Sequence, residues 1–114
     1  MSKAELKIVA FDKIDFVPRF EHGDVCKIGE TIGASDGTEL GTGFARMDGA
    51  RIPWTTSYDE VLTVFEGELT VHAGGKAHRL GPRDSLWIPS GTELIYEAKH
   101  ALVHYAIHPV SAAS

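Results

Sequence analysis

Apolar residues alternate with polar residues in short stretches along almost the whole chain. The period is close to two, and no segment keeps the i, i+3, i+4, i+7 spacing of an amphipathic helix over ten residues. Turn residues separate the stretches at intervals of about eight to twelve residues, which is typical of a sandwich or barrel. The pattern therefore predicts an all-β protein with strands at residues 5–11, 24–32, 41–48, 59–66, 68–73, 76–80, 85–89, 93–98 and 101–108.

The turns between these stretches contain residues with a defined backbone preference. Gly74 and Gly75 separate two short runs, and paired glycines accept the positive φ values of a type I′ hairpin turn. Neither an internal repeat nor a low-complexity linker interrupts the pattern. We predict one domain over residues 1–114, made of amino-terminal strands in 1–40, a core in 41–109 and a frayed tail in 110–114.

Composition excludes several classes of partner. The net charge is −5, from 16 acidic and 11 basic residues without a Lys or Arg block, so the attraction that drives nucleic-acid binding is missing. Cys26 is the one cysteine, which suits a reducing compartment. Neither a membrane-spanning run of roughly 18 apolar residues nor an uncharged signal-peptide core is visible. We predict a soluble, cytoplasmic protein that binds neither nucleic acid nor membrane.

Two motifs in the second half of the chain resemble those of the cupins. The first runs from Glu60 through Gly67 in "EGELTV", and the second is "GPRDSLWIPSG", with Pro89 and Gly91. The match covers about residues 40–109. More narrowly, "WTTSYDEVLTVFEGEL", "LWIP" and "YAIHP" resemble the small cupins of the ethanolamine-utilisation (EutQ-like) family. The resemblance implies a cupin-type jelly-roll β-barrel, also called a double-stranded β-helix, with Glu60 pointing inward.

The cupin metal ligands are mostly replaced. The His-x-His of the first motif reads Trp54, Thr55 and Thr56, and the histidine of the second motif is Leu94. One surviving carboxylate lacks the three or four protein ligands of an ordinary site, so we predict no metal or other cofactor. A divalent metal stays as an alternative: His104 and His108 alternate along the last strand and would join Glu60 if their face is the barrel interior. If His104 and His108 instead lie on the outer face of the strand, Tyr105 points into the barrel, and this is the favoured interpretation.

An inward Glu60 also sets the faces of its strand. Leu62 then shares its face, whereas Val61 and Phe65 point outward. Because both faces are apolar, the outer one needs a cover, either the amino-terminal strands or a second subunit. We therefore expect a homodimer.

A buried carboxylate needs a partner, because burial disfavours its charged form. Candidate partners are Arg46, the hydroxyls of Tyr58 and Tyr96, a ligand amine or a metal. The structural alternative is a simple pair with Arg46 or a tyrosine. The functional alternative is an acceptor or general acid and base at the floor of a pocket.

Aromatic and hydroxyl side chains surround the predicted position of Glu60. They suit a small organic ligand, including one with an ammonium group, although the aromatic residues would also serve as barrel filling. The predicted ligand-binding residues are Trp54, Thr56, Tyr58, Glu60, Trp87, Tyr96 and Tyr105.

Two functions remain open. The first is a metal-independent small-molecule-binding protein, linked through the resemblance to amine or aldehyde metabolism. The alternative is an isomerase- or lyase-type enzyme, in which Glu60 moves a proton and Tyr58 or Tyr96 polarises the substrate, or in which Glu60, His104 and His108 hold a metal.

Overall fold

The computed structural model describes residues 5–113, apart from the side chain of Phe20. Residues 1–4 and 114, the two ends of the predicted domain, lie outside the described residues. The described chain is all-β, as predicted, and its helical structure is confined to short 3-10 turns. The strands are β1 (Val17–Pro18), β2 (Cys26–Ile32), β3 (Gly41–Thr55), β4 (Asp59–Gly67), β5 (Leu69–Ala73), β6 (Lys76–Leu80), β7 (Ser85–Ile88) and β8 (Glu93–His108). The 3-10 turns are η1 (Phe11–Lys13), η2 (Phe20–His22), η3 (Ala34–Asp36) and η4 (Val110–Ala113).

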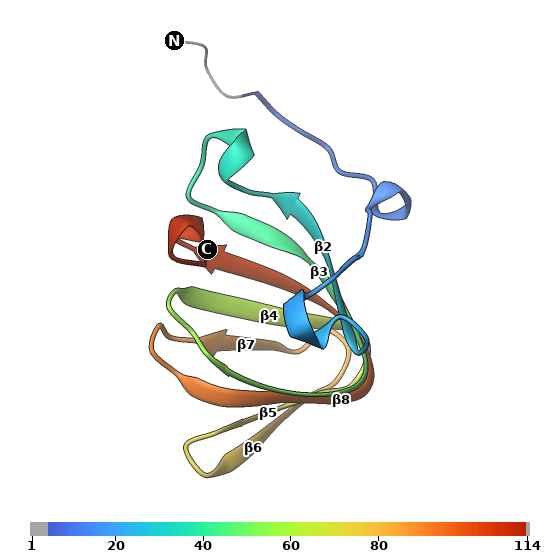
Figure 1. Cartoon of the computed structure of the whole chain (residues 1–114), viewed down its shortest axis with the longest axis vertical. Coiled ribbons are helices and arrows are strands. Elements are labelled where there is room, and N and C mark those ends of the chain that lie inside the picture. Colours follow the sequence, from blue (N-terminus) through green and yellow to red (C-terminus); the bar gives the residue numbers. More distant parts are fainter. Residues whose placement is uncertain (1–4, 114) are drawn as a thin grey trace.

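One antiparallel sheet folds over on itself around the long strands β3 and β8. Its order is β1-β2-β3-β8-β4-β7, and β5 pairs with both β6 and β8. Strand β8 pairs with β3 along nearly its whole length, with β5 through residues 95–97 and with β4 through residues 101–108. Both long strands bend beside Gly49, whose φ is +64°. Figure 1 shows the result, a stack of curved strands from β2 to the β5-β6 hairpin.

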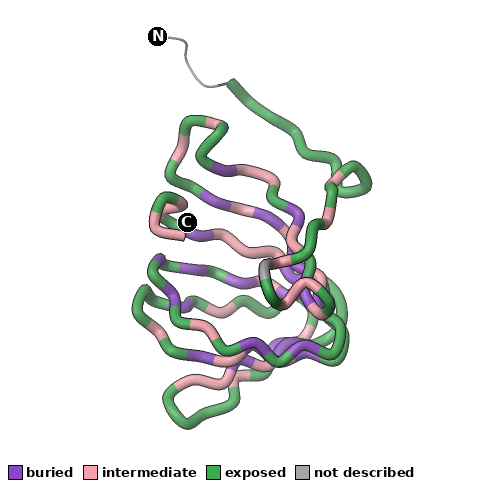
Figure 2. The backbone as a smooth tube through the Cα atoms, in the orientation of Figure 1, coloured by how far each residue is buried: buried purple, intermediate pink, exposed green. Residues whose placement is uncertain are grey.

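The core lies between the two parts of the folded sheet. Each strand alternates buried and exposed residues, as in β4, where Glu60, Leu62 and Val64 are buried and Val61 and Phe65 are exposed. Figure 2 shows buried positions recurring along the stacked strands and exposed ones along the amino-terminal segment. The largest fully buried side chains come from both parts of the sheet, and they are Ile52, Leu69, Val64, Val71, Val103 and Cys26.

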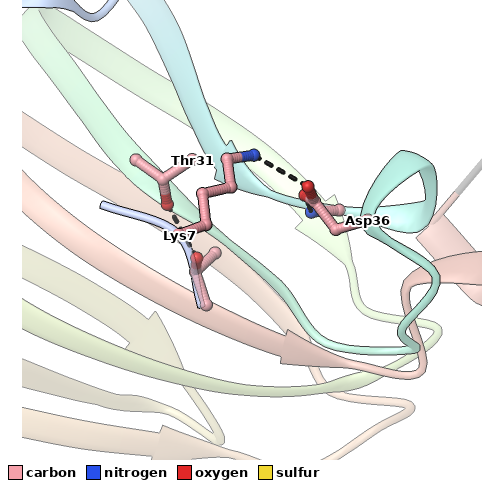
Figure 3. A network of polar contacts seen from close by, with 5 residues as sticks. Lys7, Thr31 and Asp36 are labelled. Atoms are coloured by element: carbon pink, nitrogen blue, oxygen red, sulfur yellow. Dashed lines mark hydrogen bonds and ion pairs between the residues drawn. The ribbon is translucent and has the colours of Figure 1, made fainter. Parts of the chain in front are cut away.

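The predicted strand at residues 5–11 is wrong. Residues 5–10 are extended but belong to no strand of the described chain, and residue 11 begins η1. Leu6 is 104% exposed and Ile8 is 96% exposed, while Lys7 between them donates to Asp36 of η3 at 2.9 Å (Figure 3). Alternation predicts which residues share a face, but a strand also needs a neighbour to complete its hydrogen bonds, and this segment has none among the described residues.

The larger of the other differences from the predicted boundaries lie in β3, in β8 and at the end of the chain. Strand β3 continues from Asp48 to Thr55, and the two predicted strands at 93–98 and 101–108 form the single strand β8. Exposed Lys99 and His100 read as a loop but lie at the bend of β8. Residues 110–113, in the tail predicted to be frayed, form η4, where the Val110 amide donates to the Glu39 carbonyl at 2.7 Å.

The Gly74–Gly75 hairpin turn is confirmed. Its two φ values are +61° and +75°, as a type I′ turn requires. Within residues 5–113, none of the helical segments has the length and apolar character needed to cross a bilayer.

Candidate functional site

Glu60 lies inside the folded sheet, as the cupin resemblance implied. Its side chain belongs to β4 and is 7% exposed. The Tyr96 hydroxyl donates to Glu60 Oε1 at 2.6 Å. Tyr96 comes from the first half of β8, which pairs with β5, whereas Glu60 pairs with the second half of β8. The hydrogen bond therefore joins the two parts of the sheet across the interior.

Burial controls the ionisation of this pair. Desolvation raises the pKa of Glu60 above its ordinary value of 4.5, although the Tyr96 hydroxyl and the charge of Arg19 both act to lower it. Desolvation also raises the pKa of Tyr96, and a Tyr96 phenolate would in addition face the Glu60 carboxylate. Both causes favour the neutral forms. Glu60 and Tyr96 are thus joined by a short hydrogen bond, and each group keeps its proton to a higher pH than it would in water.

A second polar cluster forms beside this pair. The Trp54 indole Nε1 donates to the Tyr58 hydroxyl at 3.1 Å. The Arg19 guanidinium lies over the Trp54 ring, with its Cζ 4.4 Å from the ring centroid. Arg19 directly follows β1, and its amide donates to the Cys26 carbonyl at 3.0 Å. The amino-terminal segment therefore brings a cation to the aromatic side chains of the interior.

These groups surround a cavity of about 600 Å³. Trp54, Tyr58, Glu60 and Tyr96 line it together with Arg19. Such a volume lies within the range of ordinary ligand sites, about 300–1,000 Å³. The cavity is thus the candidate functional site of the described chain.

The wall formed by β2 and the end of β8 adds Glu30 and Tyr105 to the cavity. Burial, aided by the charge of Glu30, raises the pKa of Tyr105 to about 12. A side chain at Gly43 would overlap the Tyr105 hydroxyl and the Gly29 carbonyl. Glycine at position 43 therefore makes room for Tyr105 inside the barrel.

Five of the seven residues predicted to bind a ligand line this cavity, and two do not. Trp87 is 66% exposed and lies on the outer face, paired with Val61 across β7 and β4. Its neighbour Ile88 is the buried one, so strand alternation directs the indole outward. Thr56 is buried, but its hydroxyl donates to the Pro89 carbonyl and accepts from the Thr92 amide, both at 3.1 Å. Thr56 stabilises a turn and is not among the cavity residues.

The predicted roles of Arg46 and of the two histidines near Glu60 depend on which face of the sheet each side chain occupies. Arg46 does not reach Glu60, because it points outward over the rings of Phe11 and Phe16. His104 packs against Phe44 on the outer face, with ring centroids 4.9 Å apart. His108 shares that face and is exposed. The alternative of a metal held by Glu60, His104 and His108 is therefore wrong.

The donor set around Glu60 does not resemble a metal centre. Among residues 5–113, no three His, Cys, Asp or Glu side chains come together. The neighbours of Glu60 are instead a phenol, an indole and a guanidinium, and the last of these is a cation that would repel a metal ion.

Arg19 and Glu30 were missed by the sequence reasoning. Arg19 lies in "FVPRFEHG", a stretch without clear periodicity, and its contact with Trp54 joins residues far apart in the chain. Glu30 lies on a predicted strand, and strand alternation could have identified it as a cavity residue. It shares a face with Ile28 and Ile32, and all three side chains line the cavity.

The fold defines the class of protein. The chain has the cupin jelly roll, and it matches the crystal structure of a Cupin_2 domain from Enterobacter cloacae with a TM-score of 0.65 and 16% identity over 74% of this chain and 96% of that chain. More narrowly, the chain belongs to the family described as ethanolamine utilisation protein EutQ, whose model matches residues 2–114.

Two relatives from Salmonella typhimurium illustrate this membership. The crystal structure of an ethanolamine utilization protein Q has a TM-score of 0.84 and 26% identity, over 92% of this chain and 87% of that chain. A protein named acetate kinase EutQ is 32% identical over 94 residues, which is 81% of this chain and 41% of the relative. The chain thus spans about two fifths of that relative's length.

Proposed function

We propose that the chain binds a small organic molecule in the cavity beside Glu60, without a metal ion. The observation that carries this proposal is the Tyr96–Glu60 hydrogen bond in the wall of a cavity of about 600 Å³. Aromatic faces with polar atoms at their rims suit a compact organic ligand. The buried Glu60 carboxyl and the phenols offer hydrogen bonds that fix the orientation of the ligand.

The proposed setting is the metabolism of small acids, amines or aldehydes. Ethanolamine utilisation in the family's description and acetate kinase in the relative's name both suggest such compounds. Because the chain spans 41% of that relative, its kinase activity is not carried over. We place this function in a reducing compartment such as the cytoplasm, where the free, fully buried Cys26 stays a thiol.

The two tryptophans provide the first test. Trp54→Ala should weaken binding about 30-fold, the effect of losing a tryptophan that contributes roughly 2 kcal/mol. Trp87→Ala is the matched control, because Trp87 lies on the outer face, and it should leave affinity unchanged. Binding is measured by ligand-detected NMR on the EDTA-treated chain with small acids, amines and aldehydes as probes. Equal effects of the two substitutions, or binding only after metal is restored, would contradict the proposal.

The raised pKa of Glu60 favours catalysis as a second candidate function. A carboxyl group whose pKa is raised by burial is a better proton donor to a bound substrate than an ordinary carboxylate. In this case the cavity would show turnover, and Glu60→Gln would abolish it while leaving binding within a few fold. Turnover retained by Glu60→Gln would exclude this role.

We further propose that a second copy of the chain covers the outer face of β4 and β7. Val61, Phe65 and Trp87 are 43%, 52% and 66% exposed there. Beside them, Thr63 and Ser85 bond each other at 2.8 Å. His104 has its pKa lowered by burial and stays neutral. Most of these side chains are uncharged, so two copies of a chain with net charge −5 join this face with little repulsion, although exposed Asp59 lies on the same face at the start of β4.

This interface predicts a defined change in oligomeric state. The wild-type chain should elute as a dimer in size-exclusion chromatography with light scattering, and Trp87→Glu combined with Phe65→Glu should elute as a monomer. Lys76→Glu, an exposed change in the β5-β6 hairpin, should remain dimeric. A monomeric wild type, or a dimeric double variant, would rule this interface out.

A further inference from the structure

The charges in the cavity point to one class of ligand. We infer that the cavity takes a monocarboxylate with an apolar body, and that Arg19 binds the carboxylate. This inference rests on the proposed function and deepens it. It assigns a binding role to Arg19 and a selective role to Glu30.

Arg19 is a cation without a carboxylate partner. No acidic side chain in residues 5–113 forms an ion pair with it, and its guanidinium is held over Trp54 at 4.4 Å in the cavity wall. Its charge acts on the ionisation of four other cavity residues, namely Tyr58, Glu60, Tyr96 and Tyr105. A guanidinium presents a planar fork of donors that matches a carboxylate. Arg19 is half-buried and its side chain also hydrogen-bonds Tyr58 and Cys26; a ligand carboxylate would add a counter-charge to this guanidinium.

The same geometry disfavours an ammonium ligand. Arg19 already occupies the face of Trp54, which is the surface that a ligand cation would use. Glu60 is buried and accepts the hydroxyl of Tyr96, so it provides a hydrogen bond rather than a free anion. An ammonium group placed here would face Arg19 with a like charge.

A second negative charge on the ligand is also disfavoured. Glu30 lines the same cavity as Arg19, and no ion pair within residues 5–113 neutralises its carboxylate. Glu30 is exposed to solvent, but its carboxylate would still repel a second ligand charge that Arg19 does not neutralise. The affinity of a dicarboxylate should therefore fall below that of the monocarboxylate of equal length.

The remaining wall is apolar and roomy. It is formed mainly by Ile28, Ile32, Leu62, Val103, Ile107 and Val110. A two-carbon acid would leave most of the volume of about 600 Å³ to water. Each buried methylene should strengthen binding by roughly fourfold. The ligand is thus a longer acid, and acetate should bind weakly.

The test is a set of matched probes. Calorimetry and ligand-detected NMR on the full chain with EDTA would compare acetate, butyrate and hexanoate, then hexylamine, hexanamide and adipate. Hexanoate should bind about tenfold or more tightly than the amine, the amide and the diacid, since a hydrogen bond to a charged group is worth that factor or more. Affinity should rise from acetate to hexanoate.

Two substitutions assign the roles. Arg19→Gln should remove the preference of hexanoate over hexanamide, and Arg19→Lys should retain part of it because the charge stays. Glu30→Gln should raise the affinity for adipate and leave that for hexanoate unchanged. Arg79→Gln, exposed on β6, is the control. Near-ultraviolet circular dichroism checks that each variant keeps its tertiary structure.

The outcomes separate this inference from the proposed function. Binding of hexylamine or hexanamide as tight as that of hexanoate, or an unchanged preference in Arg19→Gln, overturns the carboxylate assignment but leaves a binding protein. Adipate binding as tight as hexanoate binding overturns the role of Glu30. Failure of every probe to bind counts against the proposed function itself.

Discussion

Gly67→Ala should lower the free energy of unfolding by about 3–5 kcal/mol, the sum of backbone strain and overlap with neighbouring atoms. Gly67 ends β4 with a φ of +75°. A Cβ there would overlap the carbonyl group of His100 and crowd the Cα of Ala101, all of them backbone atoms of β8. Strand β8 pairs with β3, β4 and β5, so it cannot move aside without breaking hydrogen bonds elsewhere.

Gly74→Ala is the matched control for this prediction. Gly74 has a similar φ of +61°, but a Cβ there would meet no heavy atom within 4 Å, so only the left-handed backbone costs free energy, about 1–2 kcal/mol. Asparagine tolerates that backbone better and should rescue position 74 but not position 67. Urea unfolding followed by tryptophan fluorescence measures both series. Similar losses at the two glycines would show that overlap with β8 is unimportant.

The cupin motifs and the period of two together located most of the cavity. The resemblance placed Glu60 inside, and alternation then carried the inward direction to Leu62 and, on β8, to Tyr96 and Tyr105. These inferences need only the alternation of side chains between the two faces of a strand, which follows from the local sequence. The partner of Glu60 stayed open between Arg46 and the tyrosines because the choice depends on how the sheet folds over.

The errors at the amino-terminal segment and at Arg19 needed information from distant parts of the chain, whereas the error at Trp87 was a misassigned strand face. Trp87 was assigned to the cavity by its motif, although the buried neighbour Ile88 directs it outward. Residues 5–11 alternate well but lack a neighbouring strand in the described chain. Arg19 is placed by packing between Trp54 and Cys26, and no local pattern encodes such a contact between distant segments.

The pH dependence of stability should report the buried state of Glu60. Its pKa is raised by desolvation above 4.5, so between pH 4.5 and that raised pKa the folded chain holds a proton that the unfolded chain has lost. Stability should therefore fall as pH rises through this window, by about 1.4 kcal/mol for each unit of pKa difference between the two states. Glu60→Gln cannot ionise, so its stability relative to wild type should increase over the same window.

Tyr96→Phe tests the hydrogen-bond partner of Glu60, and it should raise the pKa of Glu60 further. It removes the hydroxyl that acts to lower the pKa of Glu60 and leaves a buried carboxyl without its donor, at a cost of about 1–3 kcal/mol. The decline of its stability with pH should extend to higher pH and be larger in total than that of wild type, because Glu60 then holds its proton to still higher pH. The double variant Glu60→Gln, Tyr96→Phe should lose this additional pH-dependent decline, since neither Glu60 nor Tyr96 remains to titrate at the site. Urea unfolding across a pH series measures all four chains, and parallel curves for wild type and Glu60→Gln would show that Glu60 ionises freely in the folded protein.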